Sequence, residues 1–212
     1  MTVACVWVNG HLPFPVEYVT RLRSMVKRHL HRAHRFVCLT DNGYLLPGID
    51  TMVVPTPFVG IKGWWSKIHL FDPGRFKGRV LYLDLDTLIV DALDPIVDYP
   101  SPFALIPDAG HFRGLGRLRV CKRFNSSVMV WDAGAGDLLS KNWTPAVMTR
   151  LWGDQDWIGQ QMPRADRLPL KWFPRISECK DGVPEGAKVI LAKIPKNEKA
   201  AKIYPWFAEA WN

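Results

Sequence analysis

Two aspartates separated by a single residue, Asp84 and Asp86, follow the apolar residues 80–83. A strand buried on both faces of a parallel sheet is apolar throughout, so carboxylates are expected only where such a strand ends. Ligands of open α/β sheets bind at these carboxyl ends. Two carboxylates there can hold Mn²⁺ or Mg²⁺, and the cation can in turn hold a diphosphate. The alternative is structural, because such a pair can also cap a helix or pair with arginine and lysine side chains.

Polar side chains in three other segments could contribute to the same site. Lys67 lies in a run of apolar and aromatic residues, where the alternative is a lysine on a helix surface. Asn125 and Ser126 come before an apolar run, and an amide and a hydroxyl there can bind sugar hydroxyls. Asp154 and Gln155 begin a helical pattern, in which Asp154 can also serve as the N-cap.

The motifs follow one another in the order Lys67-x-His69, Asp84-x-Asp86, Asn125-Ser126-Ser127 and Asp154-Gln155. In this order they resemble the motifs of the GT-A nucleotide-sugar glycosyltransferases of family 8, the group of glycogenin and the lipopolysaccharide galactosyltransferases. Each motif is weak alone, and the four together in order are specific. The resemblance runs from residue 1 to about residue 160 and implies a single GT-A domain over residues 1–212. Such a domain is α/β and Rossmann-like, with a mixed, mostly parallel central sheet flanked by helices.

The resemblance implies an enzyme that needs Mn²⁺ or Mg²⁺ and moves a sugar from a nucleoside diphosphate sugar, expected to be a UDP-sugar, with retention of anomeric configuration. It assigns Asp84 to the ribose and the metal, and Asp86 to the metal. It places Lys67 near the diphosphate and the sugar, and Asp154 and Gln155 at the reacting face of the sugar. These last three are the candidate catalytic residues. A cation and basic side chains suit a leaving diphosphate, which gathers negative charge.

The residues expected to contact the nucleotide sugar share a position near the ends of predicted strands or in the matched motifs. They are Val8, Asn9, Lys67, Asp84, Asn125, Ser126 and Lys196. Trp7 and Val8, at the end of the first strand, offer the base an apolar, stacking surface. The acceptor is left open among a glycan, a lipopolysaccharide, a protein and DNA.

The chain departs from the family pattern at two positions. The family usually completes its metal site with a late histidine in a His-x-x-Gly-x-x-Lys-Pro segment. Here Lys196 matches the phosphate-binding lysine, but no histidine follows His111. The remaining metal ligands are therefore expected from diphosphate oxygens, water or a further group that the sequence does not identify, and metal and donor are expected to bind as one unit. Ser127 stands where the family has glycine, which bears on how closely the backbone approaches the donor.

Hydrophobic periodicity predicts the elements that position these residues. Strands are expected at 2–8, 35–39, 50–54, 103–106, 127–131 and 189–191, and a further strand is expected to run directly into the Asp-x-Asp motif. Helices are expected at 17–32, 63–71, 154–161 and 197–212, the last interrupted at Pro205. A strand, a helix and a second strand within the first forty residues open a parallel α/β sheet.

Composition indicates a globular protein with an anionic partner. Hydrophobic residues make up 48% of the chain, and 28 lysines and arginines against 20 acidic residues give a net charge of +8. Such a balance favours a nucleotide, a phosphorylated glycan, nucleic acid or weak association with an anionic surface. The cysteines lack Cys-x-x-Cys spacing, which favours reduced thiols and a cytoplasmic protein. No apolar stretch reaches the ~18 residues of a membrane span, and the apolar N-terminus is interpreted as a strand and not as a signal peptide.

Two other classes of protein remain as alternatives. Haloacid-dehalogenase-like phosphatases also place Asp-x-Asp after an apolar strand, but near the N-terminus and with a later acidic pair of different spacing from Gly153-Asp154-Gln155-Asp156. A basic nucleic-acid-binding protein without catalysis would explain the charge, and residues 108–123 carry six basic side chains. That segment is either a solvated loop or a flap that faces the acceptor.

Overall fold

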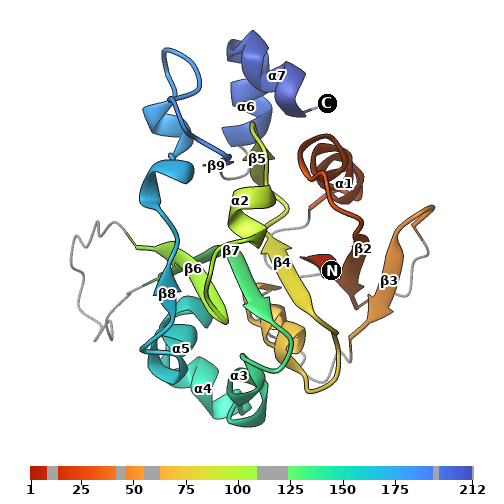
Figure 1. The fold of residues 1–212 in the computed structure, drawn as a ribbon, viewed down its shortest axis with the longest axis vertical. Helices are drawn as coiled ribbons and strands as arrows, with labels where there is room; N and C mark the ends of the chain where they lie inside the picture. The colour runs from red at the N-terminus through yellow and green to blue at the C-terminus, as the bar shows by residue number, and fades with distance from the viewer. Residues whose placement is uncertain (9–13, 42–45, 55–62, 109–123, 193–195, 212) are drawn as a thin grey trace.

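The computed structural model describes residues 1–8, 14–41, 46–54, 63–108, 124–192 and 196–211, with the backbone alone at 196–198. A seven-stranded sheet crosses the middle of the molecule in the order β3-β2-β1-β4-β7-β6-β8 (Figure 1). Its strands are β1 (Thr2–Trp7), β2 (Arg35–Thr40), β3 (Asp50–Val53), β4 (Arg79–Leu83), β6 (Phe103–Pro107), β7 (Phe124–Asp132) and β8 (Asp166–Arg167).

The direction of the strands makes the sheet mixed but mostly parallel. β3, β2, β1 and β4 run in parallel. β7 lies antiparallel between β4 and β6, and β8 runs parallel to β6. The predicted α/β fold, with a mixed, mostly parallel sheet flanked by helices, is therefore confirmed.

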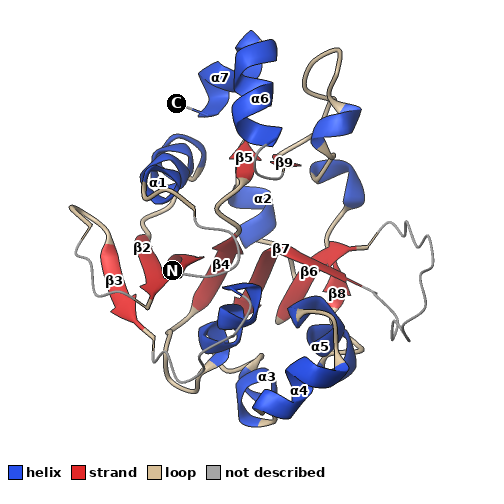
Figure 2. Ribbon diagram, turned by 180° about the vertical axis from the view of Figure 1, so that it is seen from behind, coloured by secondary structure: helices blue, strands red, loops and turns tan. Residues whose placement is uncertain are grey.

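Helices cover the two faces of the sheet in separate groups (Figure 2). One face carries α1 (Glu17–His29), α2 (Asp94–Val97), α6 (Lys196–Ile203) and α7 (Pro205–Trp211). The other carries the 3₁₀ helix η1 (Gly63–Phe71), α3 (Asp137–Lys141), α4 (Pro145–Arg150) and α5 (Asp154–Gln161). Two short 3₁₀ turns, η2 (Leu170–Trp172) and η3 (Ile176–Glu178), precede the last strand. In β4 the alternation of side chains sends Leu81 and Leu83 to the first group, and Val80 and Tyr82 to the second.

A separate two-stranded ribbon ties the C-terminal part of the chain to the Asp-x-Asp region. β5 (Thr87–Ile89) pairs antiparallel with β9 (Val189–Leu191), with Thr87 opposite Leu191. The chain that leaves β9 therefore starts out on the side of Asp86. α6 and α7 follow, and α7 packs against α1 and β5.

Several predicted boundaries are wrong by a few residues. α1 ends at His29 and not near Arg32, because Leu30 takes an extended conformation. β7 begins at Phe124, so Asn125 and Ser126 lie inside the strand and not before it. By contrast, α5 and β9 begin and end where the sequence predicts.

Two further expectations concern the described residues. The cysteines among them, Cys5, Cys38 and Cys179, are free thiols and are buried. In the same part of the chain, no helix has both the length and the apolar character that a membrane crossing requires. The basic residues of 109–123 and the donor candidate Asn9 lie outside the described residues.

Candidate functional site

Four segments that are far apart in the sequence bring polar side chains together at the carboxyl end of β4. Lys67 comes from η1, Asp84 follows β4, Ser126 lies in β7 and Asp154 begins α5. Lys67 Nζ lies 2.8 Å from Asp84 Oδ1 and 3.6 Å from Asp154 Oδ2. Lys67 also donates a hydrogen bond of 3.1 Å to Ser126 Oγ, which in turn donates one of 2.6 Å to Asp154 Oδ2. These four side chains are named the Lys67 cluster.

The Lys67 cluster is buried and charged. Lys67 and Asp154 have only 7% and 6% of their surface exposed, and Ser126 is fully buried. Burial by itself disfavours the charged amine, but the carboxylates of Asp154 and Asp84 outweigh it and raise the pKa of Lys67 above its ordinary value. The charge of Asp86 acts in the same direction. Lys67 is thus a protonated ammonium facing more than one carboxylate, and the site can take up further positive charge.

Tyr82 supports the cluster from inside β4, a role that the sequence analysis missed. Its hydroxyl donates a hydrogen bond of 2.6 Å to Asp84 Oδ1, and its ring centroid lies 5.3 Å from Lys67 Nζ. Burial, followed by the charge of Asp84, raises the pKa of Tyr82 well above its ordinary value, so the phenol remains a donor. The contact between Tyr82 and Asp84 could have been predicted from the sequence, because side chains two residues apart along a strand point to the same face of the sheet.

A hydrogen-bonded turn holds the two aspartates of the Asp-x-Asp motif. The carbonyl of Asp84 accepts from the backbone N–H of Thr87 at 3.2 Å and from the Thr87 hydroxyl at 2.7 Å. Leu85 at the centre of the turn is buried, and Asp84 and Asp86 on either side of it are half-buried. The turn therefore anchors its apolar residue in the core while both carboxylates stay near the surface.

β7 brings Ser126 into the cluster through its pairing with β4. Leu83 lies opposite Val128, and the N–H of Asp84 donates to the carbonyl of Ser127 at 2.8 Å. Asn125 Oδ1 accepts from the N–H of Ser127 at 2.8 Å, so the described contacts place Asn125 beside the cluster and not in it. Every described non-glycine residue has a negative φ, so the backbone at Ser127 is not strained by the loss of the family's glycine.

α5 directs the carboxylate of Asp154 toward Ser126. Gly153, in an extended conformation, is the N-cap of α5, and Asp154 is the first helical residue. The structural alternative of an Asp154 N-cap is therefore wrong. Trp157 anchors the helix by donating a hydrogen bond of 2.9 Å to the carbonyl of Leu139 in α3. Gln155, next to Asp154, is half-buried.

Two further candidates, Val8 and Lys196, come from the end of β1 and the start of α6. β1 pairs with β4 so that Ala4 lies opposite Tyr82, which places the end of β1 beside Asp84. Val8 there is half-buried and packs on the face that carries η1, whereas Trp7 packs on the opposite face. Lys196 is the first residue of α6, and its side chain lies outside the described residues.

His69 belongs to a different network at the end of η1. Its Nδ1 lies 3.3 Å from Asp72 Oδ2, and Asp72 also accepts hydrogen bonds from Arg75 and Ser140. Burial alone would raise the pKa of Asp72, but the hydrogen bonds from His69, Ser140 and Arg75 lower it below its ordinary value. Within the described ranges, no group of three or more His, Cys, Asp or Glu side chains could hold a metal ion.

Comparisons with known proteins rest on solved structures, because no family model and no curated protein matches the sequence. The galactosyltransferase LgtC, solved with donor and acceptor sugar analogs, is 15% identical with a TM-score of 0.64, over 92% of this chain and 88% of that one. An active-site mutant of LgtC is 16% identical with a TM-score of 0.65, over the same shares of both chains, 92% and 88%. The chain has the GT-A glycosyltransferase fold.

A third solved structure extends the comparison to another glycosyltransferase. The bifunctional enzyme WbbM, without ligand, is 13% identical with a TM-score of 0.56, over 89% of this GT-A chain and 45% of WbbM. The resemblance stated from the motifs is therefore confirmed at the level of the fold. The phosphatase alternative, which rested on the Asp-x-Asp strand alone, gains no support from it.

Proposed function

We propose that the protein is a metal-dependent glycosyltransferase that moves a sugar from a UDP-sugar to an acceptor with retention of anomeric configuration. The observation that carries the proposal is the Lys67 cluster, which forms at the carboxyl end of β4 in a GT-A fold. Ligands of open α/β sheets bind at such strand ends. The LgtC structure with donor and acceptor sugar analogs supports a sugar donor and a sugar acceptor here as well.

The donor set at the turn after β4 fits Mn²⁺ or Mg²⁺. Asp84 Oδ1 is occupied by Tyr82 and Lys67, while no described residue donates a hydrogen bond to Asp84 Oδ2. That oxygen and the half-buried carboxylate of Asp86 are the hard oxygen ligands that these cations prefer. A bound cation would supply positive charge to the leaving diphosphate.

Basic side chains are assigned to the diphosphate of the donor, and a carboxylate and an amide are assigned to its sugar. Lys67 keeps its charge and provides a second positive group for the diphosphate, and Lys196 at the start of α6 provides a third. Asp154 and Gln155 act on the sugar side, where a carboxylate stabilises positive charge at the anomeric carbon. Because the Ser126 hydroxyl is already bonded to Lys67 and Asp154, its role is to hold these two groups and not to bind a sugar hydroxyl.

Three residues around the cluster complete the donor site. Val8 follows β1, which pairs with β4, and is assigned to the base, and Asn9, the next residue in the sequence, is assigned to the nucleotide sugar. Asn125 retains its amide NH₂ group for a sugar hydroxyl, because its Oδ1 is used by Ser127.

The first experiment is calorimetric titration of UDP in the presence of Mn²⁺. Wild-type protein should bind UDP only with the metal, and Asp86→Asn should abolish binding without lowering the melting temperature, because Asp86 is half-buried. Asp91→Asn is the matched control, since Asp91 is an aspartate that pairs with Lys188 outside the cluster. Absence of UDP binding by the wild-type protein with Mn²⁺ would sink the proposal.

A second experiment addresses stereochemistry. A panel of UDP-sugars screened for hydrolysis identifies the donor, and proton NMR of the product then reports the configuration at the anomeric carbon. Retention is expected. An inverted product would contradict the family 8 mechanism while leaving the fold and the donor site intact.

A further inference from the structure

A hydrogen bond between Trp7 and Phe14 fixes the point where the chain leaves β1. Trp7 is the last residue of β1, and its Nε1 donates to the carbonyl of Phe14 at 2.8 Å. Val8, which follows directly, is a candidate for contact with the base. The position of Val8 therefore depends on what holds Phe14.

Phe14 is held by aromatic rings that lead to the C-terminal helix. The ring of Phe14 makes an edge contact with Tyr18 in α1, with centroids 5.3 Å apart at 68°. Tyr18 makes another with Trp211 in α7, again at 5.3 Å and at 73°. Edge-to-face pairs of this kind contribute about 0.5–1.5 kcal/mol beyond the area they bury. Tyr18 and Trp211 are buried, so the contacts lie within the hydrophobic core.

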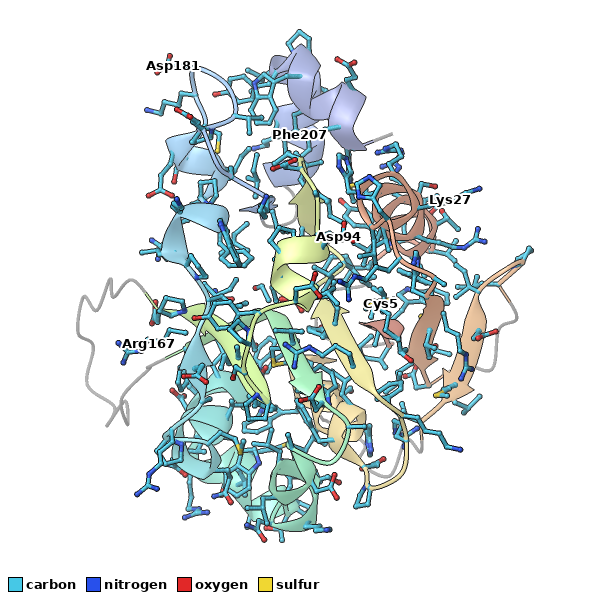
Figure 3. All side chains as sticks on the ribbon, in the orientation of Figure 1. Cys5, Lys27, Asp94, Arg167, Asp181 and Phe207 are labelled. Carbon is cyan, nitrogen blue, oxygen red and sulfur yellow. The ribbon has the colours of Figure 1, made fainter. Side chains whose placement is uncertain are left out.

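Other contacts tie α7 to α1 from the outside. Arg21 lies over the ring of Trp211 at 4.3 Å from its centroid, and Arg28 donates a hydrogen bond of 2.7 Å to the carbonyl of Ala210. Phe207 also meets Trp211, at 5.8 Å, and it lies at the inner side of the C-terminal helices (Figure 3). α7 is thereby fixed against α1 along its last turn.

The same C-terminal part of the chain begins at the metal side of the site. β9 pairs with β5, immediately after Asp86, and α7 packs on β5 as well as on α1. β9 and α7 thus pack on the strand that follows the Asp-x-Asp turn, and α7 also packs on the helix that follows β1. A segment with this placement can set the distance between the diphosphate end and the base end of a bound nucleotide.

We propose that α7, through Trp211, Tyr18 and Phe14, positions the end of β1 for recognition of the nucleotide base. The inference rests on the proposed function, and it assigns Trp211 as a positioning residue that does not itself touch the donor. A site that is already in its binding conformation avoids the cost of ordering on binding. Loss of the Trp211 ring should lower the fraction of molecules in that conformation. The apparent affinity for the nucleotide should fall in proportion to that fraction.

The test compares a ligand that has a base with one that lacks it. UDP is titrated with Mn²⁺ present, and inorganic pyrophosphate is measured by its displacement of UDP. Trp211→Ala should weaken UDP about tenfold and change pyrophosphate by less than about twofold. Trp211→Phe, which keeps an aromatic ring edge for Tyr18, should retain most of the affinity for UDP.

The control is a substitution that loosens the same core without touching the aromatic contacts to α7. Phe173→Ala removes a buried ring of the same hydrophobic cluster, and the ring of Phe173 contacts that of Trp172. It should lower the melting temperature and leave both affinities unchanged. If Trp211→Ala does not fold, Trp211→Leu keeps apolar volume without a ring edge and serves the same comparison.

The outcomes separate this inference from the proposed function. If the wild-type protein binds neither UDP nor pyrophosphate with Mn²⁺, the proposed function fails. If the wild-type protein binds UDP but Trp211→Ala leaves UDP unchanged, or weakens UDP and pyrophosphate equally, α7 does not position the base site and the inference is overturned.

Discussion

Removal of the Lys67 charge tests the electrostatics of the cluster most directly. In Lys67→Met the side chain keeps its approximate length but no longer neutralises the carboxylates of Asp84 and Asp154. Removing one partner of a buried ion pair costs about 3–5 kcal/mol, because the other charge is left uncompensated. The side chain of Asp84 is 22% exposed and can be hydrated, so the lower end, about 3 kcal/mol, is expected. For a chain of this size, that lowers the melting temperature by about 6–12 °C.

The assay is a thermal or urea melt at several pH values. The pKa of Lys67 is raised above its unfolded value of 10.5, so the stability that Lys67 contributes is fully present below that value and is lost as pH rises through the folded-state pKa. The deficit of Lys67→Met should therefore be constant between about pH 7 and pH 9.

Two further variants make this prediction sharper. Lys188→Met removes an ion pair with Asp91, whose side chain is 55% exposed, and should cost less than about 1 kcal/mol. Adding Asp154→Asn to Lys67→Met removes one of the uncompensated carboxylates and should restore part of the stability. The reasoning is refuted if Lys67→Met is no less stable than Lys188→Met, or if Asp154→Asn makes the double variant worse.

The other predictions concern neighbours of the cluster and the packing beneath it. Tyr82→Phe removes a partly buried hydrogen bond to the carboxylate of Asp84 and should destabilise the protein by about 1.5–3 kcal/mol in a urea melt; an unchanged midpoint would show that this bond is not needed. Mn²⁺ affinity should rise when UDP is added, and UDP affinity should rise by the same factor with Mn²⁺; tight Mn²⁺ binding to the free protein that ignores UDP would contradict this. Gly136→Ala would put a Cβ 2.5 Å from the Phe71 ring, so a loss of about 1–3 kcal/mol is expected, and wild-type stability would contradict the packing described for that site.

Local pattern was sufficient for those elements whose residues alternate or repeat clearly. The apolar run of β4, the helical spacing of α1 and the short apolar strand β9 are visible in the chain itself. The start of β7 cannot be recognised in the sequence, because Asn125 and Ser126 are polar. Their place in the strand depends on pairing with β6, where Asn125 lies opposite Ile106 after a register shift. Pairing of this kind depends on the neighbouring strand, so it cannot be predicted from the sequence of β7 alone.

The same division applies to the candidate site. Residue types and order were enough to name Lys67, Asp84, Ser126 and Asp154 as candidates, because a carboxylate or an amine has chemistry that apolar neighbours do not. Which of them touch one another was decided by the tertiary structure. The bond between Lys67 and Ser126 spans 59 residues, and its length depends on how η1 packs on β7. The sequence therefore names the candidate groups, whereas sheet register and helix packing decide that Ser126 bonds to both Lys67 and Asp154 and that Asn125 lies beside them.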